Sequence, residues 1–238
     1  KRVKGKELFH VIWNSTCLIG RLKGNNLNKD TLFDRIEDLG IWLKKYHQTS
    51  IDHNNECLND WLEKSFFRKL RAIQDRKLLP ADKIKNIEKL FGYKLENIQK
   101  SYNDNYVQQA WRCRVHGDFT IHNILVDKEY NLTILDFGDT RISCNLEDVS
   151  RFYSCLWAIK HTSLYRQSFF QELPDRFLKA YGLSTEIIHT DYFQCSLAFN
   201  FLTQLLAQEM MKHLLSWNSY RESRQITNAG LKWIDRQL

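Results

Sequence analysis

Three short motifs at fixed spacing constrain the fold of this chain more than any other feature. A His-Gly-Asp tripeptide occupies residues 116–118, Asn123 follows five residues after its aspartate, and an Asp-Phe-Gly tripeptide begins thirteen residues after that asparagine, at 136–138. Seven specified residues at fixed offsets would arise by chance in roughly one window in 10⁸, given ordinary residue frequencies. The combination is typical of a site for phosphoryl transfer.

The segment between the motifs predicts how their polar side chains meet. Residues 123–126 and 132–135 are short, β-prone runs with a polar link between them, which predicts a hairpin. The loop that carries Asp118 precedes the first strand, Asn123 begins that strand, and Asp136 ends the second strand. We therefore expect the three polar side chains to converge at one end of the hairpin.

Each residue type suits a defined part of phosphoryl transfer, which needs positioning and charge compensation more than covalent chemistry. Asp118 is the candidate catalytic base, which orients the attacking hydroxyl or accepts its proton. Asn123 and Asp136 are the candidate Mg²⁺ ligands, because magnesium takes one or two carboxylates together with other oxygen atoms, phosphate oxygens included. Gly138 is expected to permit a backbone turn just after the second metal ligand.

Three further residues are expected to support this site. Asp148 lies twelve residues after the second metal ligand, at the start of a predicted amphipathic helix. It is expected either to cap that helix or to accept hydrogen bonds from the catalytic loop. His47 and His116 are interpreted as structural hydrogen-bonding residues, because a carboxylate already supplies the base.

Apolar periodicity predicts a mostly helical chain around the hairpin. One amphipathic helix is expected over residues 32–47, with Asp30 as its N-cap, and another after Asn145. The other expected elements are a β-hairpin within residues 6–22, helices over 56–76 and from 82 onward, and about three helices near the C-terminal end that are broken at Pro174 and Gly182.

Composition excludes several classes of protein. With 43% apolar and 13% aromatic residues the chain has material for a core and is not disordered. The longest uncharged run, residues 192–208, contains polar side chains and is expected to be a buried helix rather than a membrane span. No signal peptide is expected at residues 1–6. The six cysteines form no CxxC pair, which favours reduced thiols and a cytoplasmic protein.

The formal charge of +7 is unevenly distributed. Residues 1–48 carry ten basic and five acidic side chains, and residues 61–100 carry eleven and five, whereas residues 101–150 carry four and eight. Acid concentrated at the motifs suits a Mg²⁺ site, and a basic surround attracts a nucleotide. The basic helices are interpreted mainly as solvated faces, so no specific nucleic acid is expected as a partner.

At the motif residues the sequence resembles the aminoglycoside phosphotransferase-like kinases, a family that includes choline kinase-type enzymes. The resemblance is specific for residues 115–148 and extends more loosely to residues 17–47. It implies a protein-kinase-like α+β fold: a mostly helical C-lobe with a short catalytic β-hairpin, and an N-lobe largely absent from this chain. Residues 1–24 would be the remnant of an N-lobe hairpin and hinge. Residues 25–238 would be the helical C-lobe, with the catalytic loop at 115–148 and acceptor-pocket helices at 150–238.

The resemblance also implies contacts with the nucleotide and substrate. The backbone of Gly20, Arg21 and Leu22 would meet the adenine of the nucleoside triphosphate. Many members carry His-Pro-Gly directly before the asparagine, whereas this chain has Thr-Ile-His at 120–122, which makes His122 a candidate for substrate contact. Only about 20 residues precede the expected hinge, and no GxGxxG occurs, so the phosphate-covering loop of a complete nucleotide-binding lobe is not expected within this chain. Either that lobe is not included in this chain, or the protein lacks it and would bind ATP poorly.

The function implied is ATP-dependent transfer of a γ-phosphoryl group, with Mg²⁺, to the hydroxyl of a small molecule. The short interval between Asp136 and Asp148 leaves no room for the peptide platform of protein kinases. Residues 151–211 carry five basic and five acidic side chains, which favours a sugar, an amino alcohol or a glycan over a polycationic acceptor. The alternative is a non-catalytic kinase-like binding module. ATP or GTP as donor, and the oligomeric state, stay open at this point.

Overall fold

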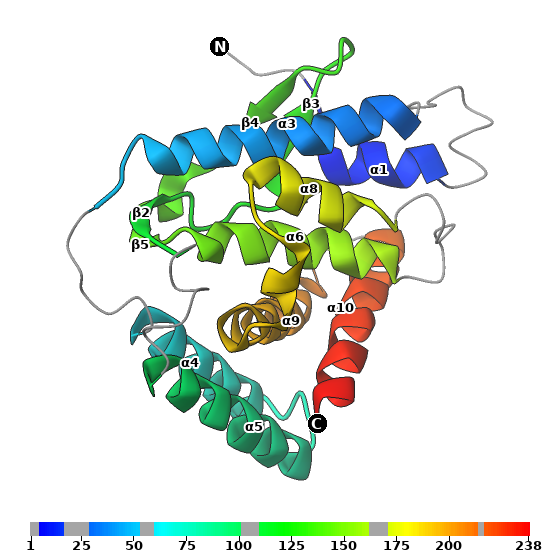
Figure 1. Ribbon diagram of the computed structural model, residues 1–238. Coiled ribbons are helices and arrows are strands. Elements are labelled where there is room, and N and C mark those ends of the chain that lie inside the picture. Colours follow the sequence, from blue (N-terminus) through cyan, green and yellow to red (C-terminus); the bar gives the residue numbers. More distant parts are fainter. Residues whose placement is uncertain (1–4, 17–28, 53–59, 101–109, 162–170, 214–216) are drawn as a thin grey trace. The chain divides into compact units, whose positions relative to one another are not determined.

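The computed structural model describes residues 5–16, 29–52, 60–100, 110–161, 171–213 and 217–238. The chain divides into two compact units. Unit 1 comprises residues 1–52 and 113–185, and unit 2 comprises residues 53–112 and 186–238. Each unit is therefore built from two separate stretches of chain. In Figure 1, unit 1 accordingly combines elements coloured from blue to yellow, and unit 2 combines cyan and green helices with orange and red ones.

Unit 1 holds the small sheets and the motif residues, together with four helices among the residues described. Its elements are β1 (Lys6–Glu7), α1 (Leu8–Thr16), α3 (Lys29–Gln48), β2 (Arg112–Val115), η2 (Ile121–Asn123), β3 (Ile124–Val126), β4 (Leu132–Ile134), η3 (Phe137–Asp139), β5 (Arg141–Cys144), α6 (Leu146–Lys160) and α8 (Leu173–Tyr181). Unit 2 is helical where it is described. Its elements are α4 (Asp60–Asp75), α5 (Ala81–Lys100), η4 (Thr185–His189), α9 (Asp191–Met211) and α10 (Trp217–Gln237).

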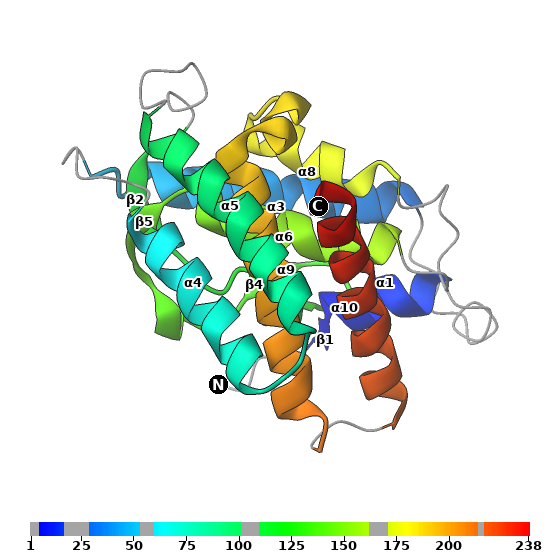
Figure 2. The same ribbon diagram turned by 90° about the horizontal axis from the view of Figure 1, so that it is seen from below.

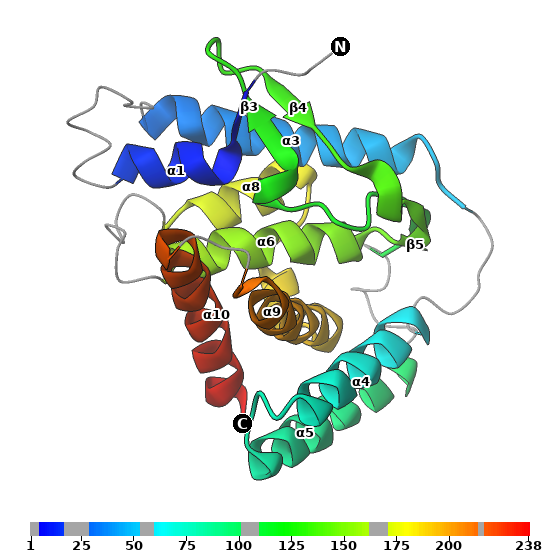
Figure 3. The same ribbon diagram turned by 180° about the vertical axis from the view of Figure 1, so that it is seen from behind.

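The hairpin predicted from the sequence between the motifs is confirmed as β3 and β4. These strands are antiparallel, with Ile124 opposite Ile134 and Val126 opposite Leu132, and β1 pairs with the other edge of β3. Figure 3 shows the three strands beside α1. Strands β2 and β5 form a second, two-stranded sheet. These short strands are enough to hold the motif residues together at one end of the hairpin.

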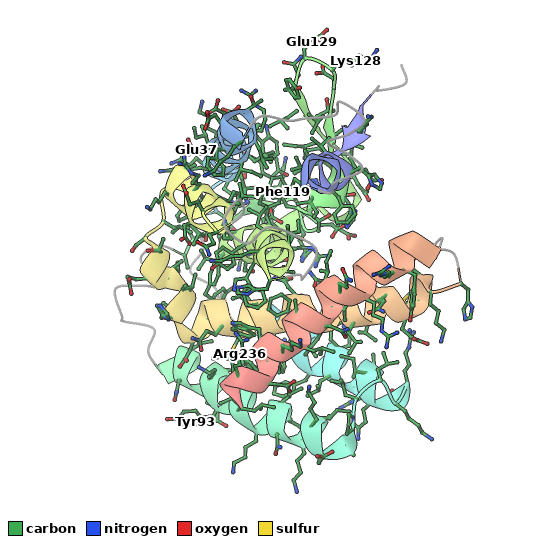
Figure 4. The ribbon with its side chains drawn as sticks, turned by 90° about the vertical axis from the view of Figure 1, so that its right-hand side faces the viewer. Glu37, Tyr93, Phe119, Lys128, Glu129 and Arg236 are labelled. Atoms are coloured by element: carbon green, nitrogen blue, oxygen red, sulfur yellow. The ribbon has the colours of Figure 1, made fainter. Side chains whose placement is uncertain are left out.

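The turn of the hairpin is stabilised by Asp127. One of its carboxylate oxygens accepts the backbone N–H groups of Glu129 and Asn131, both at 2.9 Å. Asparagine and aspartate often make such turns, because their short side chains reach the backbone two residues on. The Asn131 side chain also donates to Asp127, at 3.0 Å, and this bond, followed by the two backbone bonds, lowers the pKa of the Asp127 carboxyl. Lys128 and Glu129 lie at the exposed tip (Figure 4).

Helices α3 and α8 pack closely in the core of unit 1. A Cβ atom added at Gly40 of α3 would lie only 2.8 Å from the carbonyl oxygen of Phe177 and 2.9 Å from Cβ of Ala180, so the contact requires glycine. Helix α8 ends at Gly182, which has the left-handed φ of 93° typical of a helix C-terminus. Helix α3, confirmed by the structure, thus approaches α8 at Gly40 more closely than a larger residue would permit.

Phe119, directly after the motif aspartate, anchors the catalytic loop in this core. Its buried ring lies 5.8 Å from the Trp42 ring of α3 and 5.1 Å from the Phe152 ring of α6. Figure 4, with α1, α3 and α6 nearly end-on, places Phe119 among them. Burial of a phenylalanine side chain stabilises a fold by roughly 1.5–3 kcal/mol.

In unit 2, α4 and α5 form a helical hairpin, and both contact α9 (Figure 2). Phe66 of α4 and Phe91 of α5 are fully buried, with ring centroids 5.4 Å apart. Helix α9 begins where the Thr190 side chain accepts the N–H of Phe193, an ordinary N-cap bond. No helix among the described residues is long and apolar enough to cross a membrane.

Three sequence expectations about local structure need correction. The strand expected over residues 6–12 is wrong beyond Glu7, because α1 begins at Leu8 and its apolar side chains recur at helical spacing. Asp30 lies in the first turn of α3 rather than at its N-cap. The breaks expected at Pro174 and Gly182 agree with the two ends of α8, which has Pro174 in its first turn and Gly182 as its C-cap. Asn123 ends the 3₁₀ turn before β3. The second half of the expected N-terminal hairpin and the domain boundary at residue 24 lie outside the described residues.

Candidate active site

Asp118 and Asn123 are joined by two hydrogen bonds at the entrance to the hairpin. Nδ2 of Asn123 donates to the backbone oxygen of Asp118 at 2.9 Å and to its Oδ2 at 2.8 Å. An amide side chain has its donors on nitrogen and its acceptor on oxygen. Because the nitrogen is engaged by Asp118, the amide oxygen of Asn123 is the atom left to meet a cation.

Asp136 lies at the same end of the hairpin as Asn123. The N–H of Leu135 donates to the carbonyl oxygen of Asn123 at 2.8 Å, which extends the strand pairing to the residue just before Asp136. Asp136 has left-handed backbone angles, φ 60° and ψ 65°, and its side chain is exposed. Such angles are uncommon outside glycine and often occur at functional sites. The left-handed backbone at this point is that of Asp136 itself, and Gly138, which was expected to permit a backbone turn just after it, has no positive φ.

The donor atoms at this end of the hairpin fit a magnesium ion. No group of three or more His, Cys, Asp or Glu side chains suited to a metal occurs among the described residues. Mg²⁺ does not need one, since it usually binds one or two protein oxygens and completes its octahedron with water and phosphate oxygens. Asn123 and Asp136 offer one amide oxygen and one carboxylate, which suits Mg²⁺ better than a softer metal.

Arg151 forms an ion pair with Asp118 that the sequence did not reveal. Its Nε donates to Oδ1 of Asp118 at 2.8 Å, and its Nη2 donates to the same oxygen. Arg151 belongs to α6, three residues after Asp148, so the two side chains lie on one face of the helix. In the sequence, only that spacing and the expected contact between Asp148 and the catalytic loop could have indicated that Arg151 lies near Asp118. The Arg151 side chain is 21% exposed and that of Asp118 is 29% exposed.

The buried carboxylate of Asp148 holds the catalytic loop from below. Its Oδ2 accepts the backbone N–H of His116 at 2.6 Å, and its Oδ1 accepts that of Gly117 at 2.9 Å. Of the two roles expected for Asp148, the structure shows the second. Hydrogen bonds from backbone N–H groups to a carboxylate are among the stronger ones in proteins.

His47 connects this carboxylate to helix α3 and to a buried polar chain. Its Nε2 lies 3.0 Å from Oδ2 of Asp148, and its Nδ1 lies 2.8 Å from the hydroxyl of Tyr181. That hydroxyl accepts from Nδ2 of Asn145 at 3.0 Å, so its own hydrogen is available for His47. Every member of the chain is satisfied when His47 carries its hydrogen on Nε2. Burial raises the pKa of the Tyr181 hydroxyl, which keeps it a donor.

His116 links the catalytic loop to the strand that precedes Asp136. Its Nε2 lies 2.8 Å from the carbonyl oxygen of Leu135, which can only accept. Its Nδ1 is the acceptor for the N–H of Asp118 at 3.3 Å. These two partners determine the tautomer, with hydrogen on Nε2. His116 is thus fully buried and structural, in agreement with its interpretation from the sequence.

Gly117 is required by both its backbone angle and its surroundings. Its φ is 84°, and an added Cβ would collide with the carbonyl oxygen of Asp139 and lie 2.6 Å from Nη1 of Arg141. Nη1 of Arg141 also donates to that carbonyl oxygen at 2.9 Å, and Nη2 pairs with Oε1 of Glu147. The segment after Asp-Phe-Gly is therefore packed directly on the catalytic loop and tied to α6.

Glu147 is buried beside this loop and beside Asp148. Burial is the largest influence on its carboxyl and raises the pKa from 4.5 to about 7, although the Arg141 guanidinium acts in the opposite direction. The Asp148 carboxylate adds to the rise. The buried Glu147 carboxyl, which forms an ion pair with Arg141, therefore has a pKa close to neutral pH.

The other predicted site residues lie apart from these contacts or outside the described residues. His122 is exposed, and its Nδ1 lies 3.2 Å from Oε2 of Glu7, while its ring packs 4.9 Å from that of Phe9. Its contact with substrate stays a prediction. Gly20, Arg21 and Leu22, the predicted adenine contacts, lie outside the described residues.

Comparison with known protein families agrees with this geometry. The model of a phosphotransferase enzyme family (APH) matches residues 2–194, which is most of the chain. This chain belongs to the phosphotransferase enzyme family. The match contains every motif residue from His116 to Asp148, as well as Arg151. No match is found among curated protein sequences.

Solved structures confirm the kinase-like fold of this phosphotransferase family member. A glucosamine kinase has a TM-score of 0.54 at 13% identity, with 96% of this chain and 57% of that chain covered. Choline kinase LicA from Streptococcus pneumoniae has a TM-score of 0.52 at 10% identity, with 88% of this chain and 66% of that chain covered. An ethanolamine kinase from Plasmodium vivax has a TM-score of 0.51 at 15% identity, with 89% of this chain and 64% of that chain covered. The chain thus spans 57% to 66% of the length of these structures.

Proposed function

We propose that this phosphotransferase family member is a small-molecule kinase, which transfers the γ-phosphoryl group of ATP to a hydroxyl group. The observation that carries the proposal is the pair of hydrogen bonds from Asn123 to Asp118, which engages the amide nitrogen and leaves the amide oxygen of Asn123 for a cation. In this arrangement Asp118 is suited to bind the acceptor, and Asn123 and Asp136 are suited to bind the metal ion. The family match supports it, as does a glucosamine kinase of similar fold whose structure holds glucosamine, ADP and inorganic phosphate.

In the proposed reaction Asp118 receives the acceptor hydroxyl. Three protein hydrogen bonds already reach its carboxylate, two on Oδ1 and one on Oδ2, which leaves more room for a hydroxyl at Oδ2. The acceptor oxygen forms a bond with the γ-phosphorus as its proton passes to Asp118. The bond from that phosphorus to the β,γ-bridging oxygen breaks, and its electron pair leaves with ADP. A Mg²⁺ ion bound by Asn123 and Asp136 would neutralise negative charge on the phosphates.

A small molecule fits the acceptor side better than a peptide does. The interval from Asp136 to Asp148 is filled by η3 and β5, and it is tied back to the catalytic loop through Arg141 and Gly117. A protein kinase needs several tens of residues in this interval to support a peptide. We therefore propose a sugar, an amino alcohol or a glycan hydroxyl as acceptor.

The test is turnover by the full native polypeptide with Mg²⁺ and ATP, followed by phosphorus NMR across a panel of sugars and amino alcohols. Asp118→Ala should lower the rate at least about 10³-fold, since it removes the group that orients the hydroxyl. Glu129→Gln, at the exposed tip of the same hairpin, is the matched control and should leave the rate unchanged. Turnover retained by Asp118→Ala would sink the assignment.

The alternative of a non-catalytic binding module has its own outcome in this test. It predicts no phosphorylated product from any acceptor with the wild-type protein. Thermal denaturation with and without ATP and Mg²⁺ then separates the two cases, because a ligand that binds only the folded state raises the melting temperature. A rise without turnover would favour the binding module.

A further inference from the structure

The ion pair between Arg151 and Asp118 places a positive charge directly beside the proposed acceptor site. Two N–H groups of the guanidinium reach Oδ1 of Asp118, one of them at 2.8 Å. A guanidinium has five N–H groups in a fixed plane. Within the described part of the chain no hydrogen bond from the other three is found, and the side chain is 21% exposed. The remaining donors are therefore accessible to a ligand.

The pair changes the charge that an acceptor meets. An unpaired Asp118 would attract an ammonium group placed next to the reacting hydroxyl. With Arg151 bound to Oδ1, the negative charge is compensated, and an ammonium group would face N–H donors of like charge. The second arginine near the loop, Arg141, binds Glu147 and the Asp139 carbonyl, so the Glu147 carboxylate already compensates its charge.

The pair also offers two complementary hydrogen-bonding groups side by side. Oδ2 of Asp118 accepts from a hydroxyl, and the guanidinium on the Oδ1 side donates to an oxygen. Two hydroxyl groups on neighbouring carbons present a donor and an acceptor in this order. An amino alcohol presents a second donor instead, which the guanidinium cannot receive because arginine has no acceptor atom.

We infer that Arg151 is a specificity-determining residue that selects an uncharged acceptor with two neighbouring oxygens, such as a sugar or polyol diol, over an ammonium alcohol. The inference rests on the proposed function and narrows it. Helix α6 sets this selectivity, because Asp148 fixes its first turn to the catalytic loop one turn before Arg151. Lysine would be a poor substitute, since its single ammonium cannot both bind Oδ1 through two bonds and keep a planar edge for the acceptor.

The test compares acceptors that differ only in one group, with the full native polypeptide, Mg²⁺ and ATP. The pairs are ethylene glycol with ethanolamine, and glucose with glucosamine. For the wild-type protein kcat/KM should be at least tenfold higher for the diol in each pair. Arg151→Met should raise KM for the diol about tenfold and lower KM for its ammonium counterpart. Arg151→Lys should fall between, and Arg71→Met, at an exposed position of α4, should change neither.

Opposite shifts for the two acceptors distinguish selectivity from a merely structural role, which would lower both rates alike. Equal losses in Arg151→Met, or a wild-type preference for the ammonium member, would overturn the inference while leaving the kinase assignment in place. Absence of any product from all four acceptors and from a wider sugar panel would instead reject the proposed function, and the inference with it. The wild-type comparison decides the matter even if Arg151→Met does not fold.

Discussion

Oδ2 of Asp148 lies 3.0 Å from Nε2 of His47, which joins two buried side chains separated by 101 positions in the sequence. The same carboxylate accepts the N–H groups of His116 and Gly117. One side chain thus connects α3, α6 and the catalytic loop. Its removal would leave three donors in the core of unit 1 without a partner.

Asp148→Ala should lower the free energy of unfolding by about 3–5 kcal/mol, because buried donors that lose a charged acceptor cannot recover hydrogen bonds from water. Urea denaturation followed by circular dichroism measures the change. Asp34→Ala, at an exposed position of α3, is the matched control and should stay within about 0.5 kcal/mol of the wild type. Equal effects of the two variants would contradict the central place given to Asp148.

Gly117→Ala should destabilise the protein by about 1–3 kcal/mol, because its left-handed backbone and its contacts with Asp139 and Arg141 both reject a Cβ atom. Gly138→Ala is the comparison, since Gly138 has no positive φ and an added Cβ would meet only Oδ1 of Asp136, at 3.3 Å. Thermal melting of the two variants should therefore differ clearly. Identical melting temperatures would refute the packing described for Gly117.

Two helical glycines should respond to alanine with opposite signs. Gly40→Ala should cost about 1–3 kcal/mol, since the new methyl would overlap the α8 backbone. Gly92→Ala, in α5, should add about 0.5–1 kcal/mol, because the nearest atom is Cζ of Phe67 at 3.8 Å and alanine is the better helix former. Denaturant titration of each single variant tests the pair. A stabilising Gly40→Ala would mean that α3 and α8 are further apart than described.

Stability should depend on pH through Glu147. A carboxyl whose pKa is raised on folding binds more protons in the folded state between its ordinary value of 4.5 and its raised value of about 7. Its contribution is therefore fully present below about pH 4.5 and is lost as the pH rises through 7. Relative to Glu147→Gln, which does not titrate, the wild-type protein should lose about 2 kcal/mol between pH 5 and pH 8. A difference that does not change with pH would contradict this.

Local spacing explains what could be predicted from the sequence. The hairpin and the helices at α3 and α6 follow from apolar periodicity and turn residues within one short window, and the structure confirms them. Helix α1 was missed because Val11 and Ile12 favour strands, and the helical spacing of Leu8, Phe9 and Ile12 was too short to outweigh them.

Long-range contacts explain what could not be predicted. His47 was expected to be a structural hydrogen-bonding residue, but its partner lies on another helix and no local pattern points to it. Arg151 was counted only as a charge, because its ion pair with Asp118 depends on how α6 packs against the catalytic loop. The left-handed backbone of Asp136 was not predicted either, because such angles are uncommon outside glycine and residue preference gives no signal for them here.

Unit 1 is assembled from two stretches of chain, so its first stretch is synthesised before the second stretch, on which it packs, exists. At about 5–20 residues per second, the ribosome adds Asp148 roughly 5–20 s after His47. During that interval the apolar face of α3 has been made, but its partners in α6 and α8 have not. The nascent chain therefore exposes the apolar face of α3 until α6 and α8 have been synthesised. A chaperone that binds apolar helices would bind this face during that interval.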